Sequence, residues 1–331
     1  MRTLPAQSVH TCISSPPYFG LRDYGVDGQI GQEPWADCLG WATGNRCGKC
    51  FVCTLVDVYR EVRRVLRDDG TCWVNLGDSY ASSGGQSPQS GKLFKGRLRQ
   101  RENVCISARV HHADIPAKNL RGLPWRVALA LQADGWILRQ DIIWAKPNPM
   151  PESVGDRCTK AHEYLFLLAK QQRYYYDADA IRTPFSAETK AQSFDTMDFK
   201  KRDQYKKPDG WDTGKGGHGT IHRAGRGKGQ KAPTDYVPPN GANKRSVWTV
   251  PTKAYAEAHF ATFPPALIEP CVLAGCPVGG TVLDPFGGSG TTGEVAESLG
   301  RDSILIELSP EYVALASRRT QQGGLLLRTT A

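Results

Sequence analysis

A serine, two prolines and a tyrosine follow the first apolar run of the chain, Val9 to Ile13. Ser15 offers a hydroxyl group, and Tyr18 offers an aromatic ring with a phenol hydroxyl. Pro16 and Pro17 have no N–H to donate, so they extend neither a paired strand nor a helix interior. The four residues therefore predict a rigid turn directly after a strand, with a polar group and a ring held in fixed positions.

A second chemical pattern lies near the other end of the chain, in the run TVLDPFGGSGTTGEVAESLG of residues 281–300. Gly288, Gly290 and Gly293 match G-x-G-x-x-G, and Glu307 follows 19 positions after Gly288. This spacing is typical of a nucleotide site, in which backbone N–H groups approach the ligand and the acid binds ribose hydroxyls. NAD, a flavin or S-adenosylmethionine would each satisfy the pattern.

Four cysteines with the spacing C-x8-C-x2-C-x2-C form a third group, namely Cys38, Cys47, Cys50 and Cys53. Close thiols in CxxC steps are suited to tetrahedral zinc, in a site that would be structural. A ferredoxin-type run would need a further cysteine at position 57, which is Asp57, so an iron–sulfur cluster is the lesser option. Free thiols in a loop are the remaining alternative.

The elements that must position these groups alternate between strands and helices, which indicates an α/β fold whose mostly parallel sheet has helices on both faces. Apolar runs predict strands at Val9–Ile13, Thr71–Leu76, Ile137–Trp144, Glu163–Ala169, Thr281–Leu283 and Ser303–Leu308. Helical patterns cover Leu55–Leu66, Trp125–Ala133, Pro265–Ala274, Thr291–Leu299 and Pro310–Arg318. Only about two strands lie in the glycine-loop half, so the other strands must come from upstream and the fold is a permuted one.

The motifs SSPPY and DPFGGSGTT, in this order, resemble the catalytic and cofactor motifs of the β-class DNA amino-methyltransferases. The segments VYREVRRVLRDDGTCWVNLGD, DIIWAKPNPMP, AHEYLFLLAK and AHFATFPPALIEPCVLAG also resemble family segments, so the resemblance covers most of the chain. It implies a permuted Rossmann-like fold with inserted loops, and methylation of N4 of cytosine or N6 of adenine by S-adenosylmethionine. Family members usually carry one more strand and a short helix ahead of the catalytic strand, and the residues after Met1 resemble the end of that helix.

The resemblance also assigns roles to the first motif. The amine of a base is a poor nucleophile because its lone pair is delocalised, and acceptors on Ser15 and the Pro16 carbonyl would localise it. Pro17 would hold the turn, and Tyr18 would stack on the flipped base. Serine before the prolines is more typical of N4-cytosine enzymes, with N6-adenine as the alternative. The cofactor residues that the resemblance implies are Asp284, Phe286, Gly288, Gly290, Thr291, Glu307, Phe260, Phe263 and Pro264.

By the same resemblance the chain divides into a catalytic half at 1–185, a target-recognition insertion at 186–246 and a cofactor-binding half at 247–331. The catalytic half includes a Cys-rich insertion at 31–53 and a loop at 82–116. Residues 186–245 hold 13 Lys and Arg against 7 Asp and Glu, which is six of the nine net positive charges of the chain. This charge, interleaved with aromatic residues, favours contact with phosphates and bases over a solvated linker.

Double-stranded DNA is therefore the expected partner, with a restriction endonuclease of the same system and a second copy of the chain as further options. No apolar run approaches the roughly 20 residues of a membrane span, so we expect a cytoplasmic protein without a membrane partner. Two rival functions stay open at this point. One is an RNA methyltransferase of similar architecture, and the other is a catalytically idle, zinc-containing nucleic-acid-binding protein.

Overall fold

The computed structural model describes residues 1–20, 26–81, 115–184, 241–252 and 263–328, the last eight of these by backbone alone. The chain divides into a larger unit, Met1–Ala180 with Arg245–Ala331, and a smaller one, Ile181–Lys244. In the smaller unit Thr183 and Ala242 form an antiparallel bridge. Most of the basic insertion predicted at 186–246 and of the loop predicted at 82–116 lies outside the described residues, so their roles stay predictions.

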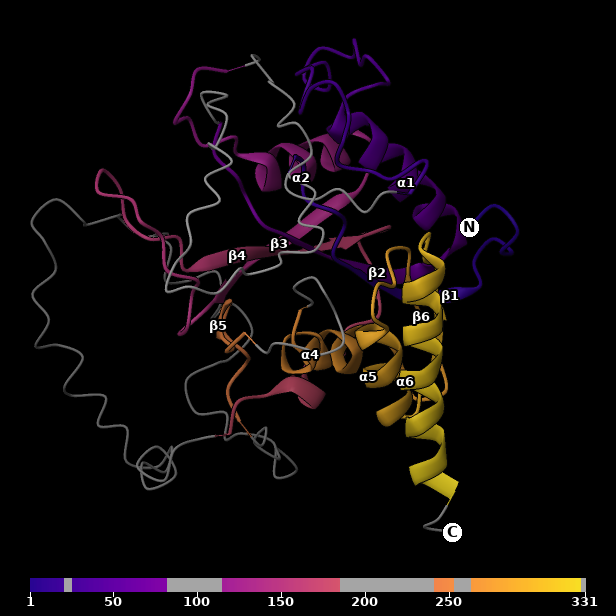
Figure 1. The fold of residues 1–331 in the computed structure, drawn as a ribbon. Helices are drawn as coiled ribbons and strands as arrows, with labels where there is room; N and C mark the ends of the chain where they lie inside the picture. The colour runs from indigo at the N-terminus through magenta and orange to yellow at the C-terminus, as the bar shows by residue number, and fades with distance from the viewer. Residues whose placement is uncertain (21–25, 82–114, 185–240, 253–262, 329–331) are drawn as a thin grey trace, which may run out of the picture. The chain divides into compact units, whose positions relative to one another are not determined.

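One sheet crosses the larger unit, with seven strands among the described residues in the order β5-β3-β4-β2-β1-β6-β7 (Figure 1). The strands are β1 (Val9–Ser14), β2 (Leu66–Leu76), β3 (Ile137–Ala145), β4 (His162–Ala169), β5 (Val247–Thr249), β6 (Thr281–Asp284) and β7 (Asp302–Leu305). The pairs that include β4 are antiparallel and the other pairs are parallel. The predicted α/β fold with a mostly parallel sheet is confirmed, with one reversed strand near its middle.

Helices cover both faces of this sheet, as predicted. They are α1 (Phe51–Val65), α2 (Leu123–Ala133), α4 (Pro265–Gly275), α5 (Thr291–Ser298) and α6 (Pro310–Arg328), with a short 3-10 turn η1 (Asp179–Ile181). Figure 1 shows α1 and α2 on one side of the strands and α4, α5 and α6 on the other. Among the described residues, none of the helices combines the length and the apolar character needed to span a membrane.

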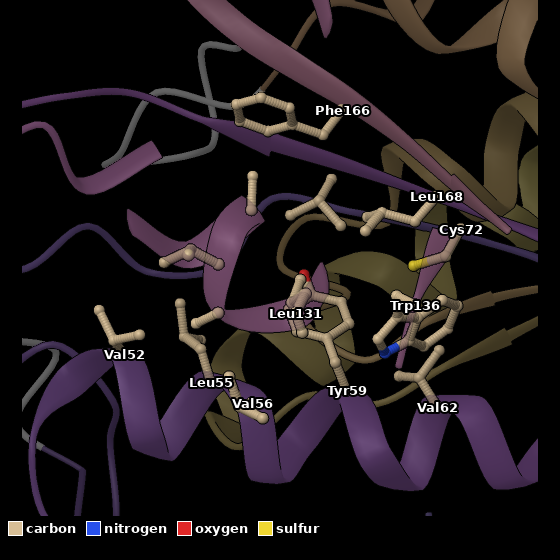
Figure 2. Close-up of a cluster of buried hydrophobic side chains, with 14 of the residues drawn as sticks. Val52, Leu55, Val56, Tyr59, Val62, Cys72, Leu131, Trp136, Phe166 and Leu168 are labelled. Atoms are coloured by element: carbon tan, nitrogen blue, oxygen red, sulfur yellow. The ribbon is translucent and has the colours of Figure 1, made fainter. Parts of the chain in front are cut away.

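The core between α1 and the sheet follows from the spacing of apolar residues along this helix. The side chains that recur every three or four positions are fully buried, namely Val52, Leu55, Val56, Tyr59 and Val62. Figure 2 shows them facing Leu131 of α2, Trp136, and Cys72, Phe166 and Leu168 of the sheet. Each buried apolar side chain stabilises the fold by about 1.5 to 3 kcal/mol relative to an exposed one. The Tyr59 hydroxyl also lies 2.7 Å from the Ser14 hydroxyl, which fixes the last residue of β1 against α1.

Two element boundaries differ from prediction in ways that affect the site. Helix α1 begins at Phe51 rather than Leu55, because the Cys50 sulfur caps the helix by accepting from the backbone N–H of Cys53. The end of the Cys-rich insertion predicted at 31–53 is therefore the first turn of α1. Strand β7 ends at Leu305, so Glu307 lies in the loop after the strand rather than at the end of the strand.

Candidate functional site

The Ser15–Tyr18 turn and the glycine loop begin at the same edge of the sheet. Strands β1 and β6 are parallel neighbours, with Thr11 opposite Val282 and Cys12 opposite Leu283. Strand β1 ends at Ser14 and β6 at Asp284, each within two residues of the Cys12–Leu283 pair. The two segments that follow these strands therefore leave the sheet side by side. The carboxyl ends of parallel strands are the usual position for ligands in open α/β sheets.

A polar network joins the turn to strands that are distant in the sequence. The Tyr18 hydroxyl donates to Glu163 Oε2 at 2.6 Å, and Asn75 Nδ2 donates to the same oxygen at 3.2 Å. The Ser15 hydroxyl donates to Asn75 Oδ1 at 3.5 Å, the long limit of a hydrogen bond. Lys146 Nζ pairs with Glu163 Oε1, and both side chains are largely buried. The network therefore connects Ser15 and Tyr18 through one shared carboxylate.

Asn75, Lys146 and Glu163 were not predicted as site residues. They reach this edge because β2 and β3 end here and the antiparallel β4 begins here. The available signals were a polar residue near the end of one predicted strand, Asn75, a basic residue just beyond the end of another, Lys146, and the acid at the start of a third, Glu163.

The Tyr18 ring is also held by close backbone packing. A Cβ atom at Gly77 would lie 2.6 Å from Cε2 of this ring, so glycine is needed at that position. Phe19 is buried and packs against Phe51 with ring centroids 5.5 Å apart, and the Arg121 guanidinium lies 5.4 Å from the Phe19 ring centroid. Pro16 is buried and Pro17 is half-buried. The segment is thus fixed on several sides, and the chain turns at Phe19 and Gly20, directly after the four residues for which the turn was predicted.

The glycine loop begins at Asp284, the last residue of β6, whose side chain is 1 % exposed. Its carboxylate accepts from the Phe286 N–H at 3.0 Å and from the Thr292 hydroxyl at 2.6 Å. Burial raises the pKa of Asp284 to about 7, and the nearby Glu307 adds to this, although both hydrogen bonds act in the opposite direction. The buried carboxyl group therefore ties the loop to the first turn of α5.

Glu307 and Gly290 shape the other side of the loop. Glu307 Oε2 accepts from the Gly288 N–H at 2.8 Å, so the acid lies on the loop that its spacing predicted. Gly290 precedes α5 with φ at +84°, and a Cβ atom there would lie 2.8 Å from Cα of Ala316 in α6. The Thr291 hydroxyl at the start of α5 is buried and accepts from the Arg319 side chain of α6 at 2.9 Å.

The remaining residues predicted to bind the cofactor, apart from Phe286 of the glycine loop, lie directly before α4. Pro264 is the N-cap of α4 and is buried, Phe263 and Phe286 are half-buried, and Phe260 lies outside the described residues. Helix α4 leads through a short turn into β6, so it runs against the direction of that strand. The start of α4 therefore lies toward the edge at which β6 ends.

The four predicted metal ligands come together at the start of α1. The sulfur atoms of Cys38, Cys47, Cys50 and Cys53 all lie within 4.8 Å of one another. Cys50 and Cys53 are buried, whereas Cys38 and Cys47 are half-buried. The chain thus brings four soft ligands to one point, far from the glycine loop in sequence.

Comparison of the sequence with known families gives one match along most of its length. A family described as DNA methylase matches residues 9–318. The Type II methyltransferase M.Cfr9I of Citrobacter freundii is 40 % identical over 97 % of this chain and 84 % of its own length. M.SmaI of Serratia marcescens, also a Type II methyltransferase, is 41 % identical over 93 % of this chain and 82 % of its own.

Solved structures with the same fold are more distant in sequence. The cytosine-N4-specific PvuII DNA methyltransferase superposes with a TM-score of 0.54 at 19 % identity, over 96 % of this chain and 81 % of its own. TTHA0409 of Thermus thermophilus, complexed with S-adenosyl-L-methionine, gives 0.51 at 22 % identity, over 97 % of this chain and 89 % of its own. These likenesses agree with the permuted Rossmann-like fold.

Proposed function

The chain belongs to the DNA methylase family of amino-methyltransferases, and we propose that it transfers a methyl group from S-adenosylmethionine to N4 of a cytosine in double-stranded DNA. One observation carries this proposal. The Ser15–Tyr18 turn and the glycine loop follow neighbouring parallel strands at one edge of the sheet. A pair of acceptors for an amine and a loop suited to a nucleoside-like methyl donor therefore lie next to each other.

Ser15 and Pro16 would accept hydrogen bonds from the exocyclic amine. Ser15 directs its own hydrogen to Asn75 Oδ1, which leaves the lone pairs of its oxygen to accept from the amine. Asn75 keeps its amide oxygen toward Ser15 because its Nδ2 donates to Glu163 and to the Tyr164 carbonyl at 3.1 Å. With its hydrogens held in this way, the amine nitrogen loses conjugation with the ring and becomes a better nucleophile.

Tyr18 would stack on the target base. An amine inside a stacked duplex is out of reach, so the base must be flipped out, at a cost of a few kcal/mol. The Tyr18 ring is held in advance by Gly77 and by the hydrogen bond to Glu163. A ring that is already fixed loses little conformational entropy when the base arrives.

The donor set around the glycine loop fits S-adenosylmethionine. Backbone N–H groups at the start of α5 and the Glu307 carboxylate suit the nucleoside part, and half-buried aromatic rings suit its apolar portions. When bound, S-adenosylmethionine supplies an electrophilic methyl group on a sulfonium. Asp284 would support cofactor binding indirectly, by holding the glycine loop in place, because its carboxylate already accepts hydrogen bonds from the Phe286 N–H and the Thr292 hydroxyl. The other proposed contacts are Phe286, Gly288, Gly290, Thr291, Phe260, Phe263 and Pro264.

The choice of cytosine over adenine rests on two points. Serine precedes the prolines in this chain, and the PvuII enzyme of the same fold is cytosine-N4-specific. N6 of adenine is the alternative, since a hydroxyl can accept from either amine. The excess positive charge of the insertion at 186–246 supports a role in target recognition, and the Type II names of the relatives support a restriction endonuclease partner.

Incubation of the purified chain with tritiated S-adenosylmethionine, offering duplex DNA and total RNA in parallel, tests this function. We expect label in DNA alone and, after digestion to nucleosides, in N4-methyldeoxycytidine. Label in RNA alone would overturn the proposal in favour of an RNA methyltransferase. No transfer, together with no saturable heat on titration with S-adenosylmethionine, would instead indicate an idle binding protein.

A further inference from the structure

The four-cysteine cluster at the start of α1 has the dimensions of a single-metal site. The sulfur of Cys53 lies 3.8 Å from that of Cys38 and 4.0 Å from that of Cys47. Four sulfurs at about 2.3 Å from a central zinc stand about 3.8 Å apart along the edges of the tetrahedron. The two sulfurs of a disulfide would be about 2.05 Å apart, so these thiols are not disulfide-bonded, but they are close enough to bind one metal ion together. We propose that Cys38, Cys47, Cys50 and Cys53 bind one Zn²⁺ and that this metal braces the Ser15–Tyr18 turn.

Backbone N–H groups point at the sulfurs in the way that thiolate ligands require. Cys38 Sγ accepts from the Cys47 N–H at 3.4 Å, and Cys47 Sγ accepts from the Lys49 N–H at 3.3 Å. Cys50 Sγ accepts from the Cys53 N–H at 3.5 Å, at the positive end of the α1 dipole. Such donors favour negatively charged sulfur and so prepare the site for a cation.

The sulfur-only ligand set and its compactness select the metal. Soft thiolate ligands favour zinc, copper(I) or iron–sulfur clusters over hard cations such as Mg²⁺ and Ca²⁺. An iron–sulfur cluster holds several metal ions and would separate the four sulfurs more widely than the 4.8 Å limit seen here. Four thiolates in a tetrahedron are a common structural zinc set, which closes the site to substrate.

The metal would close a segment that has no regular secondary structure of its own. Between Gly31 and Cys50 the described chain forms no helix or strand. Its first part is pinned to α1, because the N–H groups of Phe51 and Val52 donate to the carbonyls of Trp35 and Ala36, each at 3.1 Å. The metal would join this pinned part, through Cys38, to the later cysteines.

The same helix start contacts the turn that carries Tyr18. Phe51 lies between two of the cysteines and packs against Phe19, the residue directly after Tyr18. The Gly20 N–H donates to the Gly31 carbonyl at 2.8 Å, which ties the turn to the beginning of the cysteine segment. Zinc would therefore hold the surface against which the turn rests. The relevance of this brace to base binding rests on the proposed function. The inference of the metal site does not rest on that function.

Metal analysis of the purified full chain tests the site directly. We expect one zinc per chain in the wild type and in Cys158→Ser, a matched change at an exposed cysteine outside the cluster. Cys38→Ser and Cys47→Ser should each lower zinc affinity by roughly 100-fold or more. Replacement by Co²⁺ should give the visible absorption of tetrahedral cobalt thiolate. A wild type without bound zinc that also takes up no Co²⁺, or ligand variants with unchanged zinc content, would overturn the metal site.

Hydrogen exchange of the full chain, with zinc bound and after removal by a chelator, tests the brace. Removal should speed exchange at residues 35–53 and also at Tyr18, Phe19 and Gly20, with α6 as the internal reference. Faster exchange at 35–53 alone would refute the brace while leaving the metal site. Neither the metal analysis nor the hydrogen exchange depends on methyl transfer, so both outcomes are independent of the proposed function.

Discussion

The buried carboxyl group of Asp284 makes a quantitative prediction about stability and pH. Its pKa is raised from 3.8 to about 7 in the folded protein, chiefly by burial. The folded state therefore favours the neutral acid, and the stability that this contributes is complete below about pH 4, falls as pH rises, and is lost above about pH 7. A shift of about three pKa units corresponds to about 4 kcal/mol across the whole window.

Asp284→Asn isolates this effect because asparagine has no charge to lose. Its amide oxygen can still accept from the Phe286 N–H, and the Thr292 hydroxyl can turn to accept from its Nδ2. Any constant cost of the substitution leaves the pH dependence untouched. Relative to the variant, the wild type should lose about 2 kcal/mol of unfolding free energy between about pH 5 and about pH 7 and little beyond that.

Urea denaturation of both proteins across this range measures the difference. Thr292→Val serves as a second test, because it removes a hydrogen bond that lowers the pKa of Asp284. The decline should then extend to higher pH. A difference between wild type and Asp284→Asn that stays flat from about pH 5 to about pH 8 would show an ordinary carboxylate and refute the reasoning.

Two further substitutions test the loop and the turn. Gly290→Ala combines a left-handed φ with a clash against Ala316, so it should destabilise the fold by about 2 to 5 kcal/mol in urea titrations. Gly279→Ala has a similar φ in open space and should cost only about 1 to 2 kcal/mol; equal losses would contradict the account of α6 packing. Tyr18→Phe keeps the ring but loses the hydrogen bond to Glu163, so kcat/KM for DNA should fall about tenfold. The affinity for S-adenosylmethionine should not change, and unaltered kcat/KM would show that this hydrogen bond does not position the ring.

Much of the fold could be predicted because its signals are local. The apolar run after Ser8 predicts β1 to within one residue, and the run before Asp284 does the same for β6. Strand β5 was missed because Val247–Thr249 is three residues long and is stabilised by pairing with the distant β3. The early start of α1 was missed because Cys50, which caps it, is not among the usual capping residues.

The candidate site was predicted only where its residues follow strands in two recognisable motifs. Glu163 was missed because it reaches Tyr18 from the start of a reversed strand, 145 positions along the chain. The reversal had a signal in the sequence. No helix was predicted between the strands at Ile137–Trp144 and Glu163–Ala169, and strands without a crossover helix between them usually pair antiparallel.

Expression of the chain in a host that lacks DNA methylation, followed by sequencing that separates N4-methylcytosine from N6-methyladenine, tests the central claim most directly. The account predicts N4-methylcytosine at one recurrent DNA sequence. It also predicts loss of this mark in Ser15→Ala, and its retention in Ser8→Ala at the other end of β1. N6-methyladenine in the wild-type DNA, or N4-methylcytosine that persists in Ser15→Ala, would contradict it.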